Sequence, residues 1–131
     1  MNGRIKLSNG VEENTQAPPA GGGGPGPVGQ AELLLRLGVT PNYRGFALTL
    51  TALELLREDP EALVMVTKRL YPDVARRHRS SWRAVERNLR TAAALAWRHN
   101  PGLLRRMAGF PLEGRPTVSQ FLSILFMARE G

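Results

Sequence analysis

The chain has 131 residues, a formal net charge of +7 at pH 7 and no cysteine. Its length fits a single domain, and the lack of cysteine excludes disulfides, thiolate nucleophiles and cysteine-based zinc sites. The first twenty residues contain no apolar run of the kind that a signal peptide needs, and no apolar stretch approaches the roughly 20 residues that span a bilayer. We therefore expect a cytoplasmic protein without a membrane partner.

The positive charge is concentrated in one part of the chain. Residues 1–30 carry two basic and two acidic residues, whereas residues 68–106 carry eleven Lys and Arg against two acidic residues. Such a charge distribution attracts phosphate polymers or anionic surfaces, although it carries no information about the fold. The composition therefore predicts a polyanionic partner for the second half of the chain.

The beginning of the chain has the composition of a leader. Residues 17–29 read APPAGGGGPGPVG, and a segment so rich in proline and glycine cannot bury enough apolar area to offset its ordering entropy. Residues 1–16 are polar and weakly patterned. We expect residues 1–29 to form a flexible leader and residues 30–131 to form a helical domain.

Apolar residues at helical spacing predict consecutive helices in the rest of the chain, and strand-like alternation is absent. The expected ranges are 30–37, 41–57, 60–70, 72–78, 82–98, 101–107 and 117–129. These elements predict an all-α fold, a compact bundle of about six helices that contains a helix-turn-helix. About 100 residues suffice for one modest core of this kind.

The expected helix ends rest on capping residues. Thr40, Asp59 and Asn100 each precede a proline, and a capping side chain followed by proline at the first helical position is a typical helix start. Thr117 and Gln120 have the spacing of a capping box. Glycine suits the C-terminal end of a helix, and Gly38 and Gly109 stand at two of the expected ends.

Residues 72–98 have the layout of a helix-turn-helix. Val74 and Ala75 can anchor a short helix, the turn at residues 78–81 is brief, and Ser80 or Ser81 can cap the longer helix that follows. At about 100° per residue, the longer helix has one apolar side, formed by Val85, Leu89, Ala92 and Ala96, with Trp82 and Ala93 at its edge. The opposite side gathers Arg83, Arg87, Arg90 and Thr91, with Ala94 among them and Glu86 near the boundary.

A helix with this polar side suits the major groove of DNA. Arginine pairs with guanine in a bidentate geometry and glutamate can accept from cytosine N4. We expect base contacts from Arg83, Glu86, Arg87, Arg90 and Thr91, and phosphate contacts from Arg76, Arg77, Arg79, Ser80 and Ser81. The pattern alone also allows a solvated face with an intrahelical Glu86–Arg90 pair, an RNA partner or an acidic protein partner.

Residue patterns that would indicate catalysis, a metal or a cofactor are weak. His78 and His99 lack carboxylate or cysteine companions at ligand spacing, and a pairing of His78 with a neighbouring serine lacks an orienting acid. The glycines at 21, 23 and 26 match a dinucleotide fingerprint, but no strand precedes them and nearby prolines prevent a following helix. We expect a protein that is not an enzyme and binds no cofactor or metal.

Three segments resemble a known family: VTKRLYPDVARRH (66–78), AVERNLRTAAALAW (84–97) and RPTVSQFL (115–122). They are similar to the C-terminal DNA-binding effector domain of the master response regulator of endospore formation, and a weaker similarity covers residues 37–56. The resemblance runs from about Leu33 to Met127. It implies an all-helical domain of about six helices that binds short promoter elements and regulates transcription.

The resemblance also implies specific residues. The positions in this family that contact bases and backbone are matched by Glu86, Arg87 and Arg90. The sequence departs from the family at Ala84, where relatives usually have arginine, and at Thr91, where they often have histidine. These departures predict a DNA sequence preference that differs from that of relatives.

The resemblance implies two further partners. Relatives pair side by side on tandem sites through their C-terminal helix, which makes Phe121–Arg129 a candidate surface for self-association, and the transcription machinery is an implied partner. Relatives also carry a phosphorylated receiver domain, for which thirty residues leave no room. We expect a sequence-specific double-stranded DNA-binding regulator without a receiver. The alternative is an interaction module that pairs with a full-length response regulator.

Overall fold

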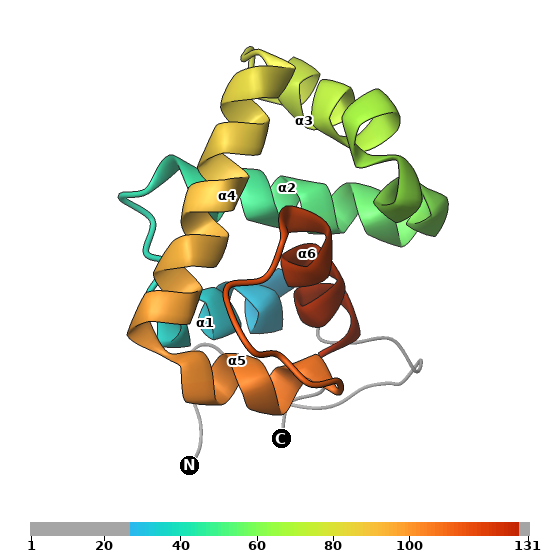
Figure 1. The fold of residues 1–131 in the computed structure, drawn as a ribbon. Helices are drawn as coiled ribbons and strands as arrows, with labels where there is room; N and C mark the ends of the chain where they lie inside the picture. The colour runs from blue at the N-terminus through green and yellow to red at the C-terminus, as the bar shows by residue number, and fades with distance from the viewer. Residues whose placement is uncertain (1–26, 129–131) are drawn as a thin grey trace, which may run out of the picture.

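The computed structural model describes residues 27–128, which are helical with short connections (Figure 1). Six α-helices follow in order: α1 (Pro27–Arg36), α2 (Arg44–Glu58), α3 (Tyr71–Arg77), α4 (Trp82–His99), α5 (Pro101–Ala108) and α6 (Val118–Met127). A 3-10 helix, η1 (Pro60–Met65), and one π-helical turn, η2 (Val66–Leu70), connect α2 to α3. No strand occurs within this range, and the predicted all-α bundle is confirmed. Of the predicted leader, residues 1–26 lie outside the described residues, and residues 27–29, which were expected to belong to it, form the first turn of α1 instead.

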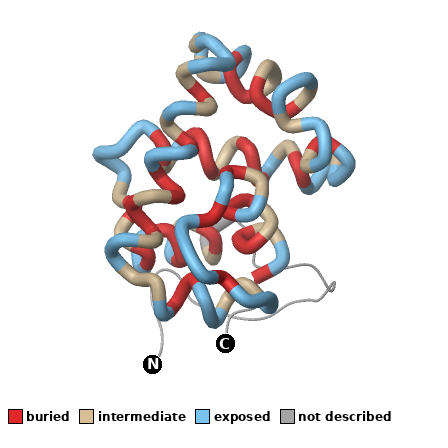
Figure 2. The backbone as a smooth tube through the Cα atoms, viewed as in Figure 1, coloured by how far each residue is buried: buried red, intermediate tan, exposed pale blue. Residues whose placement is uncertain are grey.

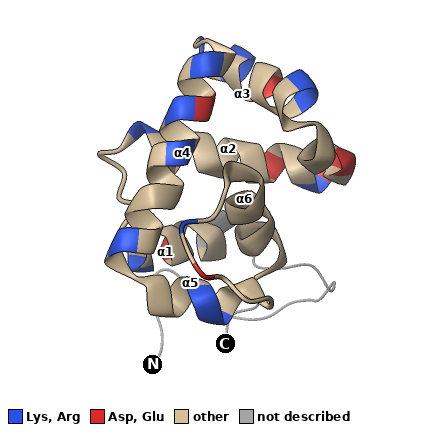
Figure 3. Cartoon of the chain, in the orientation of Figure 1, with Lys and Arg blue, Asp and Glu red and all other residues tan. Residues whose placement is uncertain are grey.

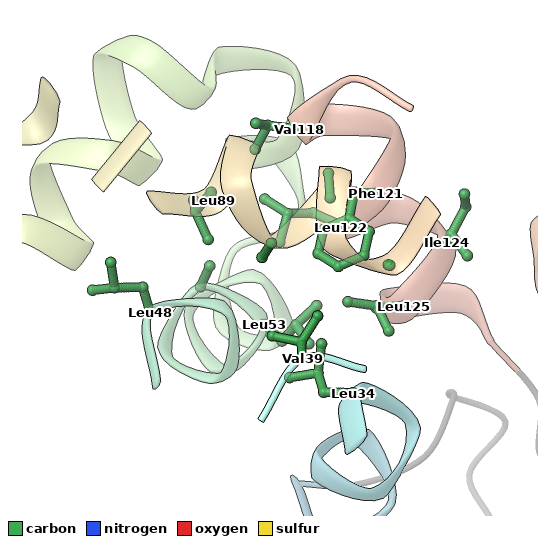
Figure 4. Packing of buried hydrophobic residues seen from close by; sticks show 14 of the residues in the cluster. Leu34, Val39, Leu48, Leu53, Leu89, Val118, Phe121, Leu122, Ile124 and Leu125 are labelled. Carbon is green, nitrogen blue, oxygen red and sulfur yellow. The ribbon is translucent and has the colours of Figure 1, made fainter. Parts of the chain in front are cut away.

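The core lies where α1, α2, α4 and α6 meet. Figure 4 shows side chains from all four helices converging, and those of Leu34, Leu53, Leu89, Phe121 and Leu125 are inaccessible to solvent. Burying one such side chain stabilises the fold by about 1.5–3 kcal/mol relative to leaving it exposed. Buried and exposed residues alternate along each helix, as Figure 2 shows, because each helix turns one side to this core.

Most of the predicted helix ends are confirmed. The Asn100 side chain accepts from the backbone N–H of Leu103 at 3.2 Å, and Thr117 and Gln120 form the reciprocal capping box. Gly109 follows α5 with φ of 72°, in the left-handed region where glycine carries no steric cost. These caps fix the connections on both sides of α5.

Two predicted N-caps are wrong. α2 begins at Arg44, after a turn through Pro41 and Asn42, and the Thr40 hydroxyl bonds the Asn42 side chain. The Asp59 side chain makes no cap bond because it pairs with Arg69 instead. In both cases the side chain bonds another polar side chain instead of a backbone N–H of the helix: a near neighbour for Thr40, and an arginine ten residues later for Asp59.

The predicted helix over 60–70 is replaced by η1 and η2. Met65 has a non-helical backbone with φ of −135° and ψ of 50°, which separates the two turns. The segment VMVT at 64–67 contains three β-branched residues, whose stiff side chains lower helix propensity. The chain therefore enters α3 at Tyr71 through η2.

Two glycines allow close approaches that place α4. A Cβ added at Gly45 of α2 would lie 2.7 Å from the backbone oxygen of Asn88 and 3.0 Å from the Ala92 Cβ. A Cβ at Gly38, where φ is 90°, would lie 2.7 Å from the Cβ of His99. The backbone of α4 is thus held at its middle by α2 and at its end by the α1–α2 connection.

Candidate nucleic-acid interface

α3 and α4 form the predicted helix-turn-helix, and they meet at one end of the molecule (Figure 1). The backbone N–H of Ser80 donates to the Ala75 oxygen at 2.9 Å, and the Ser81 hydroxyl accepts from the N–H of Ala84 at 3.1 Å. Ser81, rather than Ser80, is therefore the cap of α4. Arg79 in the turn has φ of 52°, a left-handed conformation that is uncommon for residues other than glycine.

The turn is also held from below by α2. The Nε2 atom of His78 lies 2.7 Å from the hydroxyl oxygen of Thr51, and the Arg77 guanidinium lies 3.5 Å from the Glu54 carboxylate. His78 therefore has a structural partner within the described residues. These contacts tie the end of α3 and the turn to α2.

The apolar side predicted for α4 is confirmed. Val85, Leu89, Ala92 and Ala96 are buried, and so are Ala93 and Leu95. Trp82, expected at the edge, is 39% exposed, and the Arg83 guanidinium lies 5.0 Å from the centre of its ring. A cation held over an indole ring loses some of its freedom but keeps its charge.

The opposite side of α4 is exposed and positive. Arg83, Arg87, Arg90 and Thr91 are exposed there, and Figure 3 shows basic residues along α4 and around its junction with α3. The Thr91 hydroxyl donates to the Arg87 carbonyl at 3.0 Å. The structure thus gathers on one face four of the five residues for which base contacts were predicted.

The fifth, Glu86, lies at the boundary of this face and pairs with Arg90. Their carboxylate oxygen and guanidinium nitrogen are 3.3 Å apart, with about half of the Arg90 side chain exposed. This is the intrahelical pair that the sequence left open as an alternative. An exposed pair of this spacing contributes about 0.3–0.5 kcal/mol, so a stronger partner can separate it.

The residues predicted to contact phosphates surround the N-terminal end of α4. Arg76 pairs with Asp73, and Arg77 with Glu54, but the Arg76 side chain remains 74% exposed and that of Arg77 45%. Arg79 makes no ion pair with another residue of the range 27–128. Ser81 already caps α4, so its hydroxyl hydrogen, rather than its oxygen, is the group left for a further partner.

Tyr71 is buried beneath Glu86 and Arg90. Its side chain is 3% exposed, and burial raises the pKa of its hydroxyl to about 12; the nearby Glu86 carboxylate also raises it and Arg90 lowers it. The phenol is therefore neutral at physiological pH. Together with Glu86, Arg90 and Arg115 it lines an open depression of about 420 Å³ between η2, α4 and the start of α6.

Two arginines of this region, one on α4 and one beside it, were not predicted from the sequence. Arg98 and Arg115 line a second depression, of about 250 Å³, together with Arg87 and Arg90. Arg98 stands eleven residues after Arg87, which at about 100° per residue places it on the same side of the helix. The helical spacing of the sequence could therefore have predicted its position. Arg115 belongs to the α5–α6 connection, and no local pattern predicts where such a loop will lie.

The described residues contain neither a metal-binding cluster nor a membrane-spanning helix. No group of three or more histidine, aspartate and glutamate side chains within 27–128 could hold a metal ion. No helix in that range is both long and apolar enough to cross a bilayer.

The comparison with known protein families gives a match over most of the chain. The family described as "Sporulation initiation factor Spo0A C terminal" matches residues 31–128, which is most of the chain. The resemblance seen in three sequence segments is thereby confirmed. This is a family of DNA-binding regulatory domains in sporulation and not a family of enzymes. The chain belongs to the family of C-terminal, DNA-binding effector domains of sporulation initiation factor Spo0A.

Proposed function

We propose that this protein is a transcription regulator that binds double-stranded promoter DNA in a sequence-specific manner. The observation that carries the proposal is the exposed arginine face of α4, presented by a capped helix-turn-helix whose geometry is fixed by α2. Family membership supports the DNA partner. To this partner we add which residues contact base edges and which contact phosphates.

The dimensions of α4 suit the major groove. Residues 83–91 span about 12 Å at 1.5 Å per residue, and the groove of B-DNA is about 12 Å wide. Arg83, Arg87 and Arg90 are the donors for guanine edges, and Glu86 is the acceptor for a cytosine amino group once the Glu86–Arg90 pair opens. Thr91 supplies a methyl group and a hydroxyl beside Arg87.

Phosphates flanking the groove would meet the N-terminal end of α4. Arg79 and the hydroxyls of Ser80 and Ser81 stand at the turn, and Arg76 and Arg77 on α3 reach the backbone after exchanging their carboxylate partners for phosphate. Such contacts fix the register of the protein on the duplex and carry no base information.

The experiment is selection of bound duplexes from a random library, followed by titration of the best sequence and of an unrelated duplex. We expect a clear consensus. Arg87→Ala and Arg90→Ala should each lower affinity for the selected duplex by about 1–3 kcal/mol and narrow the gap to the unrelated duplex. Arg76→Ala should instead weaken both duplexes by a similar factor, because a phosphate contact does not discriminate.

The proposal fails if no consensus emerges, or if Arg87→Ala and Arg90→Ala bind the selected duplex as tightly as the unchanged protein. Weak binding to every duplex, combined with a complex between this chain and a full-length response regulator in size-exclusion chromatography, would favour the interaction-module alternative.

Self-association on tandem sites is part of the same proposal. Most of α6 is committed to the core through Val118, Phe121, Leu122, Ile124 and Leu125. Met127, 65% exposed at the end of the helix, is the large apolar side chain that α6 leaves available for a second copy. Contact with the transcription machinery would require a further surface on the duplex-bound protein.

A further inference from the structure

The second depression beside α4 is a concentration of positive charge. It is lined by Arg87, Arg90 and Arg98 of α4 and by Arg115 of the α5–α6 connection, and no aspartate or glutamate is among the described residues that line it. Arg90 is paired with Glu86 outside this lining, but the other three guanidinium groups have no carboxylate beside them there, so they repel one another and attract an anion. Arginine is also the side chain best suited to phosphate, because its fork can donate two parallel hydrogen bonds.

The connection that carries Arg115 is fixed on both sides. Before it, the Arg105 Nε–H donates to the Leu112 carbonyl at 3.1 Å, and Arg105 itself lies 4.7 Å from the centre of the Trp97 ring of α4. After it, Pro116 is buried and Thr117 opens α6 with its capping box. The backbone at Arg115 is therefore held beside α4 before any partner binds.

Arg98 and Arg115 are available to a partner. Both are exposed, and neither forms an ion pair with another residue in the range 27–128. Glu113, the acidic residue nearest to Arg115 in the sequence, is exposed and makes no ion pair with it. By contrast, Arg105 is occupied by Trp97 and Leu112 and belongs to the scaffold.

The length of α4 places Arg98 outside the segment for which base contacts are proposed. Arg98 lies about 16 Å along the helix from Arg87 at 1.5 Å per residue, which exceeds the roughly 12 Å width of the major groove. With residues 83–91 in the groove, the C-terminal part of α4 passes over the sugar–phosphate backbone that borders it. The arginines of α3 lie at the other end of α4.

We propose that Arg98 and Arg115 form a second phosphate-binding site, which holds the DNA backbone beside the C-terminal half of α4. The site takes phosphodiester groups of the same duplex that α4 reads, so it rests on the proposed function. It extends the contact with DNA to the α5–α6 connection and makes a loop residue part of the interface.

The test uses Arg98→Gln and Arg115→Gln, with Arg106→Gln as the matched control. Arg106 is an exposed arginine of α5 that does not line the depression. Affinity is titrated for the selected duplex and for an unrelated duplex of equal length between about 0.05 and 0.2 M salt, and thermal unfolding followed by circular dichroism verifies the fold of each variant.

Loss of one phosphate contact lowers the slope of log affinity against log salt by about 0.9. Each glutamine variant should therefore bind both duplexes roughly fifteenfold more weakly at 0.05 M salt and roughly fourfold more weakly at 0.2 M. The preference for the selected duplex should stay unchanged. Arg115→Lys, which keeps the charge, should keep most of the slope, and Arg106→Gln should behave as the unchanged protein.

A second measurement locates the contact. A single neutral methylphosphonate replaces one phosphate at a time along the selected duplex. At one position this replacement should lower the affinity of the unchanged protein but not that of Arg115→Gln. If Arg98→Gln and Arg115→Gln kept the salt slopes and affinities of the unchanged protein while Arg87→Ala narrowed the preference for the selected duplex, the second site would be overturned and the proposed function would stand. Failure of the unchanged protein to bind any duplex would overturn both.

Discussion

Ser81 decides where α4 begins. Its hydroxyl accepts from the N–H of Ala84, whereas the hydroxyl of Ser80 has no hydrogen-bond partner among the described residues. The cap satisfies one of the four N–H groups that a helix leaves unpaired at its start. Because Arg83 and Glu86 lie in the first turns after this cap, the position of the first predicted base contacts depends on one hydroxyl.

The two serines give a matched pair for measurement. Ser81→Ala should lower the free energy of unfolding by about 1 kcal/mol, the usual effect of losing an N-cap, whereas Ser80→Ala should change it by only a few tenths. Urea denaturation followed by circular dichroism measures both. Equal losses in the two variants would show that Ser81 does not act as the cap.

The relation between α2 and α4 depends on a glycine. Gly45 lets the backbones approach so closely that an added Cβ would lie 2.7 Å from the Asn88 oxygen, and backbone atoms cannot move aside as a flexible side chain can. In the sequence, Gly45 is a glycine inside an expected helix, where glycine lowers the helix propensity. Such a residue is favoured only where close packing leaves no room for a side chain. Here the packing requires it.

Gly45→Ala tests this contact. In an open helix position alanine is favoured over glycine by about 0.5–1 kcal/mol, but overpacking costs about 1–3 kcal/mol, so we expect the variant to be less stable and to unfold at a lower temperature. Gly102→Ala in α5 is the control, because its Cβ would meet only the end of the Arg106 side chain at 3.6 Å. A Gly45→Ala protein as stable as the Gly102→Ala protein would contradict the close approach.

Elements with strong local chemistry were predictable, and those governed by competition were not. The cap residues Asn100 and Thr117 act as expected because no other partner takes the side-chain oxygen that accepts the helix N–H. The second contact of Asn100, to the Arg36 carbonyl at 3.0 Å, uses its amide nitrogen and leaves that oxygen free for the cap. Asp59 fails as a cap because Arg69, ten residues later, offers a charged partner that local pattern does not include. The break at Met65 had only a weak local signal, the three β-branched residues of the segment 64–67, whose effect on helix propensity is small.

At the scale of the whole molecule, the burial of Tyr71 couples stability to alkaline pH. Its pKa is raised to about 12 in the fold, mainly by burial, from about 10 in an unfolded chain. The unfolded state therefore loses its proton first as the pH rises. The contribution of the protonated Tyr71 hydroxyl to the free energy of unfolding is complete below about pH 10 and is lost between about pH 10 and 12.

This gives a prediction for unfolding. The free energy of unfolding should fall between about pH 10 and 12, and Tyr71→Phe, measured by urea denaturation across this range, should flatten the decline. Tyr43, the second tyrosine of the chain, is exposed, and Tyr43→Phe should retain the full decline. A Tyr71→Phe protein with an unaltered pH profile would contradict the assignment.

The molecule as a whole also shows how far a candidate site can be predicted. The exposed residues in the first half of α4 were predicted because they share one helix, where spacing alone determines the face, whereas Arg98 on the same face was overlooked. Arg115 was missed because its proximity to Arg87 and Arg98 arises from the path of a connection nine residues long, from Gly109 to Thr117. Three-dimensional closeness between distant segments is what a local pattern lacks.

The close packing at Gly45 has a consequence for how DNA would be distinguished. A helix whose backbone touches its neighbour can neither roll nor slide to suit an ill-fitting base-pair step without unpacking the core. Any misfit between the arginine spacing and the duplex would therefore have to be taken up by the duplex. Under the proposed function, the stiffness and groove width of the DNA would then contribute to the choice of site, including at base pairs that no side chain touches.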